Sequence, residues 1–163
     1  MSQTSHETLV GNQFGARAEA YLKSAVHSQS DDLAALVDAM RGRKDARVLD
    51  LGCGGGHVTF NVAPLVREIT AYDLSHEMLE VVGNAAGERG LTNVKTRQGA
   101  VEVLPFEDAS FDAVVSRFSA HHWTSLDAAL SEAMRVLEPG EDDAIALLAR
   151  ATGCLIKLEF VHA

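Results

Sequence analysis

The chain has 163 residues, a formal net charge of −9 and a pI near 5.1, and 47% of its residues are hydrophobic. This length suits one compact domain with its own core, and the composition excludes a disordered or fibrous chain. Because an acidic domain repels phosphate backbones, the charge disfavours a nucleic-acid partner. We expect one domain over residues 1–163.

The cysteine content and the N-terminal sequence indicate the cellular compartment in which we expect the protein. Cys53 and Cys154 are too few for the paired disulfides of a small secreted protein, so we expect two free thiols. Residues 1–8 are polar and lack the apolar core of a signal peptide, and no apolar run approaches the roughly 18 residues of a membrane span. The sequence therefore predicts a cytoplasmic protein without a membrane span.

The first part of the chain predicts two helices. A loose apolar face predicts one over about Glu7–Leu22, and a sharper one predicts another over Asp31–Met40. Ser30 or Asp31 can cap the second helix, and Gly42 ends it.

Short apolar runs then alternate with helical patterns. We expect strands at 47–51, 68–72, 94–97 and 111–116, and helices at 57–65, 75–87 and 126–137. Ser75 is the expected cap of the second of these helices. Such alternation is typical of βαβ units, which form a mostly parallel sheet with helices on both faces.

A glycine-rich loop joins the first expected strand to the next helix, in the sequence Val-Leu-Asp-Leu-Gly-Cys-Gly-Gly-Gly-His from Val48 to His57. Gly52 and Gly54 let the backbone turn sharply and let a ligand approach it closely. Asp73 ends the next strand, about 20 residues beyond the first glycine, where a carboxylate can accept hydrogen bonds from ribose hydroxyls. The alternative for Asp73 is a simple helix cap. The pattern indicates a nucleotide site.

The sequence departs from the dinucleotide-binding fingerprint at two positions, and these departures indicate which nucleotide the loop binds. His57 replaces the third glycine of that fingerprint, and Asp50 lies two residues before the first glycine. A carboxylate at that place would repel a pyrophosphate, but it would suit a sulfonium ligand that carries an amino group. The loop therefore favours S-adenosylmethionine over NAD.

Three segments carry a family resemblance: Val48–His57; Gly99–Asp112 with Leu104-Pro105-Phe106 and Ser110-Phe111-Asp112; and Ser116–Trp123 followed by Arg135–Gly140. They resemble the first motif, the adenine-side loop with the fourth strand, and the later motifs of class I S-adenosylmethionine-dependent methyltransferases. The last segment resembles the subgroup of ubiquinone and menaquinone biosynthesis methyltransferases. The resemblance covers about 14–140 and implies a Rossmann-like three-layer α/β/α sandwich.

The resemblance also implies roles for individual residues. Gly52, Cys53 and Gly54 would line the methionine and ribose portions of the cofactor, and Asp50 would face its amino group. Asp73 would hold the ribose.

Further cofactor contacts are implied from three other segments. Leu74 would pack on the adenine, and the backbone carbonyl of Ser116 would accept from the cofactor's amino group. Many relatives place an aspartate at the position of Ala100, so the adenine would instead be held by backbone groups near Ala100 and Val101. Glu102 would support this loop.

Two histidines are candidate catalytic residues. His121 and His122 follow the fourth expected strand on the substrate side of this fold, and either could accept a proton from the acceptor. The alternative is that one packs and the other bonds to the backbone. Methyl transfer needs little beyond alignment of the reacting atoms, so the reaction does not require such a base. No metal site is predicted.

The segment after Gly140 departs from the family pattern and is shorter than in relatives. Helical spacing of Ile145, Leu147, Leu148 and Ala151 predicts a helix from about Asp142, and a final strand follows from Cys154. A right-handed crossover would place that strand parallel to the fourth, in the order 3-2-1-4-5, without the usual C-terminal antiparallel strands. Its open edge predicts a homodimer or aggregation; the alternatives are a monomer whose last residues cover the edge, or a disordered tail.

Four functions follow, in decreasing order of support. The first is transfer of a methyl group from S-adenosylmethionine to a small molecule by in-line displacement, with S-adenosylhomocysteine as product. The second is a non-catalytic cofactor-binding or interaction module. The third is an NAD-dependent oxidoreductase, which Asp50 and His57 disfavour. The fourth is an RNA or protein methyltransferase, and the negative charge disfavours RNA.

Overall fold

The computed structural model describes Ala20, residues 31–138, Ile145–Ala149 and Leu155–Leu158. Apart from Ala20, the helix expected over Glu7–Leu22 lies outside these residues. Within them, one sheet has the strand order β3-β2-β1-β4-β5-β6. The strands are β1 (Arg47–Leu51), β2 (Glu68–Asp73), β3 (Val94–Gln98), β4 (Ala113–Arg117), β5 (Ile145–Ala149) and β6 (Leu155–Leu158).

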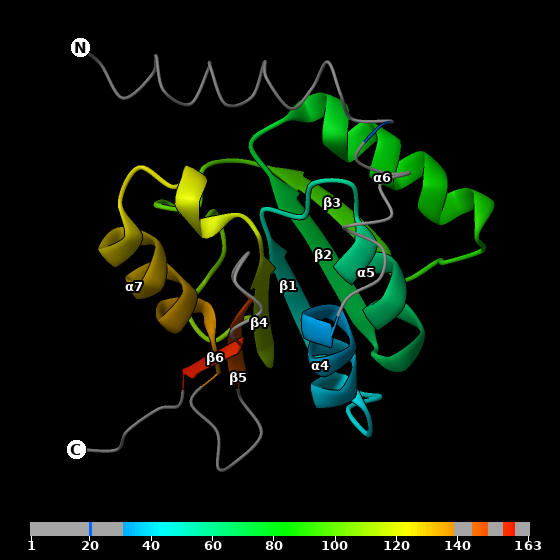
Figure 1. Cartoon of the computed structure of the whole chain (residues 1–163), viewed down its shortest axis with the longest axis horizontal. Coiled ribbons are helices and arrows are strands. Elements are labelled where there is room, and N and C mark those ends of the chain that lie inside the picture. The colour runs from blue at the N-terminus through cyan, green and yellow to red at the C-terminus, as the bar shows by residue number, and fades with distance from the viewer. Residues whose placement is uncertain (1–19, 21–30, 139–144, 150–154, 159–163) are drawn as a thin grey trace.

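Helices cover both faces of this sheet (Figure 1). They are α4 (Asp31–Met40), α5 (His57–Val62), α6 (His76–Glu88) and α7 (Leu126–Val136), with short 3-10 turns at Ala63–Leu65 and Ala120–His122. The helices α4, α5 and α6 lie on one side, and α7 lies on the other (Figure 1). The predicted three-layer α/β/α architecture is confirmed. So are the strands and helices predicted between 31 and 138, apart from shifts of one or two residues at their ends and the 3-10 geometry of Ala63–Leu65 at the end of the helix predicted over 57–65.

Alternation along the strands builds two cores. Val48, Ile69 and Val115 pack with α4 and α5 in one cluster, whereas Leu49 and Val114 pack with α7 in the other. Successive strand side chains point to opposite faces, so the central strands β1 and β4 supply both cores. The parallel pairing also aligns the carboxyl ends of β1, β2 and β4 at one edge of the sheet, where ligands bind in open α/β folds.

Side-chain caps set the start of two helices near that edge. The Ser75 hydroxyl accepts from the Met78 amide at 3.2 Å, and the Ser125 hydroxyl accepts from the Ala128 amide at the same distance. Each bond satisfies an amide that the first turn of a helix leaves without a partner. The predicted role of Ser75 as a cap is confirmed.

The C-terminal prediction is wrong in two respects. Ile145–Ala149 is a strand, β5, which pairs in parallel with β4 and takes the fifth position of the sheet. The last strand, Leu155–Leu158, pairs antiparallel with β5. The order 3-2-1-4-5 is therefore correct, but β5 is the segment expected to be helical, and one antiparallel strand lies beyond it. Residues 150–154 are too few for a parallel crossover, which needs about a dozen residues.

Among the described helices, none combines the length and the apolar character that a membrane span requires.

Candidate functional site

A small pocket lies at the carboxyl end of β1, beside the glycine-rich loop. Its lining consists of Asp50, Gly52, Cys53, Gly54, Gly55, His57, Val58, Arg117 and Phe118. The predicted residues Asp50, Gly52, Cys53 and Gly54 thus share one cavity. The chain of β1 and the segment that follows β4 meet there, although they are distant in sequence.

Different physical constraints require glycine at different positions of the loop. Gly52, Gly54 and Gly56 adopt φ values of 69°, 51° and 83°, which disfavour residues with a Cβ. A Cβ on Gly54 would meet no atom within 4 Å, so this residue leaves open space at the pocket. A Cβ on Gly52 would overlap the side chain of Ser119, and one on Gly56 would press on the Phe60 ring. Of the two glycines expected to admit a ligand, Gly54 has the open face.

Asp50 is a buried carboxylate in this pocket, with 1% of its surface exposed. The Thr59 hydroxyl donates to its Oδ2 at 2.7 Å. Burial raises the pKa of Asp50 to about 7, because the charged form loses its hydration; the bond from Thr59 opposes this effect. A positively charged ligand group beside Asp50 would relieve the cost of its ionisation.

Asp73 ends β2 and faces the same loop. Its Oδ2 accepts from the Gly54 amide and its Oδ1 accepts from the Ser75 amide, both at 2.9 Å. Burial raises the pKa of Asp73, and these backbone bonds act against the rise. Asp73 is not itself the cap of α6, which is Ser75; it accepts from the amide of that cap residue. Each carboxylate oxygen has two acceptor positions, so Asp73 retains capacity to accept from ribose hydroxyls as well.

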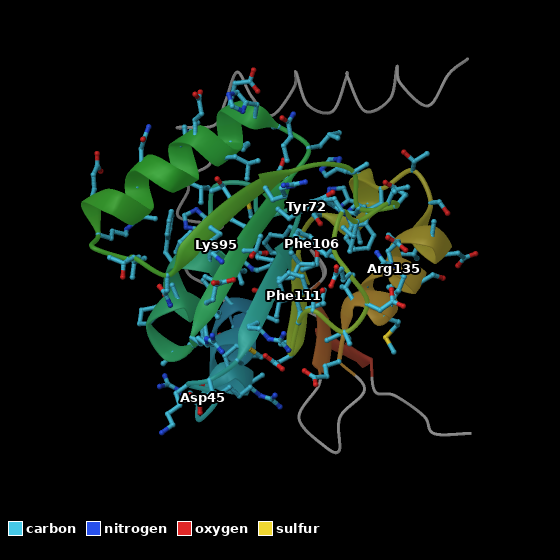
Figure 2. The ribbon with its side chains drawn as sticks, turned by 180° about the vertical axis from the view of Figure 1, so that it is seen from behind. Asp45, Tyr72, Lys95, Phe106, Phe111 and Arg135 are labelled. Atoms are coloured by element: carbon cyan, nitrogen blue, oxygen red, sulfur yellow. The ribbon has the colours of Figure 1, made fainter. Side chains whose placement is uncertain are left out.

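The predicted adenine-side residues lie on neighbouring strand ends, outside the lining of the small pocket. Leu74 follows β2 and is half-buried; Val101 follows β3 and is buried. The carbonyl of Ala100 accepts from the Tyr72 hydroxyl at 2.9 Å. Tyr72 packs near Phe106, whose ring meets that of Phe111 edge-on at 5.0 Å between centroids (Figure 2).

The loop after β3 is tied to the start of α7. One oxygen of Glu102 accepts from the backbone amides of Thr124 and Ser125, at 2.6 and 3.2 Å. The prediction that Glu102 supports this loop is confirmed. The bonds also connect the loop expected near the adenine to the segment that carries His121 and His122.

A second tie comes from α7 (Figure 2). Arg135 donates to the carbonyls of Leu104 and Phe106 at 3.0 and 2.8 Å, and Glu132 accepts from the Leu104 amide at 2.7 Å. Arg135 and Glu132 also pair with each other at 2.8 Å. The arginine of the Arg135–Gly140 motif therefore holds the loop after β3 against the helix.

Ser116 lies near the end of β4 and is buried, with 2% of its surface exposed. Its hydroxyl donates to the Leu51 carbonyl at 2.7 Å and lies 2.8 Å from the Ser119 hydroxyl. The Trp123 indole donates to the same Ser119 hydroxyl at 3.1 Å. These bonds join the end of β1 to the segment after β4.

His121 and His122 form part of the 3-10 turn after β4. Their ring centroids are 3.9 Å apart; His121 is exposed and His122 is half-buried. The backbone amide of His122 donates to the Ser119 carbonyl at 2.9 Å. Neither ring belongs to the lining of the small pocket.

Sequence reasoning missed Arg117 and Phe118 as pocket residues. Arg117 is buried, and its Nε lies 2.6 Å from Oδ2 of Asp32, which belongs to the first turn of α4. The guanidinium also lies 4.1 Å from the centroid of the Phe118 ring, and Phe118 has a φ of 57°. The available signal was a charged residue at the end of an apolar strand.

Comparison with known proteins agrees with this geometry. The family pattern described as "Methyltransferase domain" matches residues 49–141, which is more than half of the chain. The chain belongs to this methyltransferase domain family, and its fold is that of the class I S-adenosylmethionine-dependent methyltransferases. The predicted class, fold and cofactor are thereby confirmed at the level of the family.

Two relatives by sequence are named methyltransferases, and solved structures have a similar fold. The uncharacterized methyltransferase YcgJ of Bacillus subtilis is 38% identical in sequence over 77% of this chain, which corresponds to 49% of the length of YcgJ. The crystal structure of YcgJ matches with a TM-score of 0.67 over 72% of this chain and 49% of the YcgJ chain. The ubiquinone/menaquinone biosynthesis C-methyltransferase UbiE of Allorhizobium ampelinum is 38% identical over 65% of this chain and 43% of its own length. The structure of the cyclase SpnF matches with a TM-score of 0.72 and 26% identity over 85% of this chain and 58% of that chain.

The chain spans about half the length of the curated relatives it matches.

Proposed function

We propose that this protein transfers a methyl group from S-adenosylmethionine to a small-molecule acceptor by in-line displacement. The observation that carries the proposal is the buried carboxylate of Asp50 beside the open face of Gly54, at the carboxyl end of β1. Relatives named as methyltransferases support the reaction type.

The site residues fit the cofactor. The open space at Gly54 is where a Cβ would obstruct a ligand, and the ionisation of buried Asp50 would become easier beside an ammonium group. Asp50 would then bind the amino group, Asp73 the ribose hydroxyls, and Leu74 the adenine. When bound, S-adenosylmethionine supplies a methyl group activated by a positively charged sulfur.

The remaining cofactor contacts would come from backbone. Cys53 and Gly52 would complete the loop around the methionine portion, and the carbonyl of Ser116 would accept from the amino group. Backbone groups of Ala100 and Val101 would face the adenine edge, with Glu102 fixing their loop through its bonds to the start of α7.

The acceptor is proposed to be a small molecule. The net charge of −9 disfavours nucleic acid, and the relative UbiE is named for methylation in ubiquinone and menaquinone biosynthesis. His121 or His122 would take up the proton that the acceptor loses, since a histidine titrates close to neutral pH. The protein's remaining task is to align the acceptor with the methyl group and sulfur.

Thermal-shift measurements with S-adenosylhomocysteine, S-adenosylmethionine and NAD test the cofactor. We expect the first two to raise the melting temperature and NAD to leave it unchanged. Incubation with methyl-labelled cofactor and a metabolite panel then tests transfer. Stabilisation by NAD alone would contradict the proposed cofactor.

A specific observation favours a second candidate, a cofactor-binding protein that does not transfer methyl groups. The cyclase SpnF has a similar fold at 26% identity, so this architecture also occurs in a protein with a different named activity. Binding of S-adenosylhomocysteine without transfer to any member of a broad panel would favour this candidate.

Partners and location are further proposals. We propose a homodimer formed through β6, the last strand in the described sheet, because an uncovered edge strand pairs readily with another chain. Light scattering tests this, and a clean monomer at high concentration would contradict it. A cytoplasmic location is proposed from the few cysteines, and cell fractionation tests it.

A further inference from the structure

The bridge segment, residues 119–125 between β4 and α7, carries the two candidate histidines (yellow in Figure 1). At its first residue, the Ser119 hydroxyl donates to the Leu51 carbonyl at 3.1 Å, at the end of β1. The Ser119 side chain also lies directly against Gly52 of the glycine-rich loop. One end of the bridge segment is therefore fixed to the loop proposed to hold the methionine portion of the cofactor.

The other end of the bridge segment is bonded to Glu102, in the loop after β3. One carboxylate oxygen of Glu102 accepts from the amides of Thr124 and Ser125, at 2.6 and 3.2 Å. Hydrogen bonds to a carboxylate are charge-assisted and stronger than those between neutral groups. Ser125 is also the N-cap of α7. Glu102 therefore fixes the point at which the bridge segment enters the helix.

The loop that contains Glu102 has other bonds that do not involve this side chain. The Tyr72 hydroxyl donates to the Ala100 carbonyl at 2.9 Å, and two side chains of α7 bond to the amide and the carbonyl of Leu104. Loss of the Glu102 carboxylate should therefore release the bridge segment and leave in place the backbone groups proposed to face the adenine.

We propose that Glu102 is a positioning residue that couples cofactor binding to the histidines of the bridge segment. Backbone groups of Ala100 and Val101 bind the cofactor, and the bonds from Glu102 extend the stabilisation of their loop to the bridge segment. The two states of the coupling have these bonds formed and broken.

The inference rests on the proposed cofactor site and adds how its acceptor side is completed. A ligand that binds the bonded state alone lowers the population of the open state. Because such coupling is reciprocal, the acceptor should bind more tightly to the cofactor complex than to the free protein.

Amide hydrogen exchange of the wild type tests the coupling, because the amides of Thr124 and Ser125 exchange when their bonds to Glu102 open. We expect S-adenosylhomocysteine at about 100 times its Kd to slow both amides about 10- to 100-fold. The Ala46 amide, which bonds to the Arg43 carbonyl at 2.9 Å before β1, is the control and should exchange at an unchanged rate. Unchanged exchange of Thr124 and Ser125 in a protein that binds S-adenosylhomocysteine would overturn the inference.

Trp123, the only tryptophan of the chain, is a second probe within the bridge segment. Its indole donates to the Ser119 hydroxyl at 3.1 Å. Acrylamide quenching of its fluorescence should weaken when S-adenosylhomocysteine binds to the wild type. Glu102→Ala should bind this ligand within about threefold of the wild-type affinity, but its quenching should stay strong with and without ligand.

Two further variants separate the role of the bonds from that of charge. Glu102→Gln retains a carbonyl oxygen that can accept from amides, so it should recover part of the ligand-dependent change in quenching. Glu107→Ala removes an exposed carboxylate from the same loop and should behave as the wild type does.

The outcomes distinguish this inference from the proposed function. Failure of S-adenosylhomocysteine to bind the wild type would overturn both. A ligand-dependent change in quenching that persists in Glu102→Ala would overturn the inference alone, and so would loss of ligand binding in the folded variant, since Glu102 would then act on the cofactor site itself. If Glu102→Ala does not fold, Glu102→Gln serves in the same comparison, and the exchange measurement on the wild type needs no variant.

Discussion

The carboxylate of Asp73 accepts a hydrogen bond from the backbone amide of Gly54, with 2.9 Å between the two atoms. The residue expected to hold the ribose is therefore bonded to the loop expected to surround the methionine. This bond sets the distance between the two parts of the site before a ligand arrives, which reduces the ordering that binding must impose.

Replacing Asp73 by alanine should weaken S-adenosylhomocysteine binding by about 1.5–3 kcal/mol, the range for hydrogen bonds to a charged group. Calorimetric titration measures the change. Ser75→Ala is the matched control, since it removes the cap of α6 without removing the carboxylate. That variant should lose about 1 kcal/mol of stability and keep its affinity. Unchanged affinity in a folded Asp73→Ala protein would remove Asp73 from the site.

A methyl group on Gly54 should abolish detectable cofactor binding, because it would enter the open space at the pocket. Gly54→Ala also strains the backbone, since φ is 51°. Gly90→Ala carries a similar strain at a φ of 69°, also in open space, but at the end of α6 away from the pocket. Both variants should lose about 1–2 kcal/mol of stability, and Gly90→Ala should bind normally. Equal binding by the two would mean that the loop is an ordinary turn.

Asp50→Asn should make the ligand-free protein more stable at neutral pH while weakening cofactor binding. The folded pKa of Asp50 is raised to about 7 from an ordinary value of 3.8, so the folded state binds more protons than the unfolded state between these values. Wild-type stability therefore falls as pH rises through this window, and the variant lacks that fall. We expect a difference of about 1–3 kcal/mol at pH 8.

Urea unfolding at pH 4.5 and pH 8 measures this effect. The stability gain of Asp50→Asn should be small at the lower pH and large at the higher one. Asp45→Asn is a surface control in the turn before β1, where Asp45 is exposed, and its stability should not depend on pH in this way. A stability gain of equal size at both pH values would show that folding does not raise the pKa of Asp50.

Arg135→Gln should loosen the loop after β3. Loss of the guanidinium leaves the carbonyls of Leu104 and Phe106 without their donor and should cost about 1–3 kcal/mol of stability. Hydrogen exchange should show faster exchange of the Leu104 amide, which bonds to Glu132. Unchanged exchange there would indicate that Glu132 alone holds the loop.

Separate alanine variants test the two histidines. If one of them is the base, its variant should lose about 10²- to 10⁴-fold in rate and keep its cofactor affinity. His122 is half-buried and His121 is exposed, so we expect His122→Ala to show this loss and His121→Ala to retain more activity. A pH–rate profile without a limb near neutrality would count against either histidine as a base.

The elements between 31 and 138 could be predicted because local signals agree there. Ser75 caps a helix as expected, the glycine-rich loop ends β1, and apolar positions repeat with the period of each element. The ends of β4 could not be predicted as well. Phe111 has strand composition but forms only an isolated bridge with Leu137 before β4 begins at Ala113.

The segment Ile145–Ala149 shows where periodicity fails. Five apolar residues fit one buried strand or part of one buried helix, and so short a run cannot distinguish them. The helix α7 already supplied the crossover after β4, so the next apolar run had to be the next parallel strand. The topology of the preceding elements was the better guide than the spacing of Leu147 and Leu148.

Pocket residues could be predicted where they belong to one sequence motif, as Asp50 and Gly54 do. Arg117 was not, because its place at the pocket depends on Asp32, which lies 85 residues away in the sequence. No short motif contains both residues. Gly52 was assigned to the loop correctly, but its contact with Ser119 is a packing relation that only the folded chain creates.

That contact between Gly52 and Ser119 has an evolutionary consequence. The Ser119 hydroxyl also receives the Trp123 indole and donates to the Leu51 carbonyl, so its side chain has little room to shift. A larger residue at position 119 therefore alters what the neighbouring glycine must accommodate. Substitutions at these two positions therefore have to be concerted if the turn at Gly52 is to stay intact.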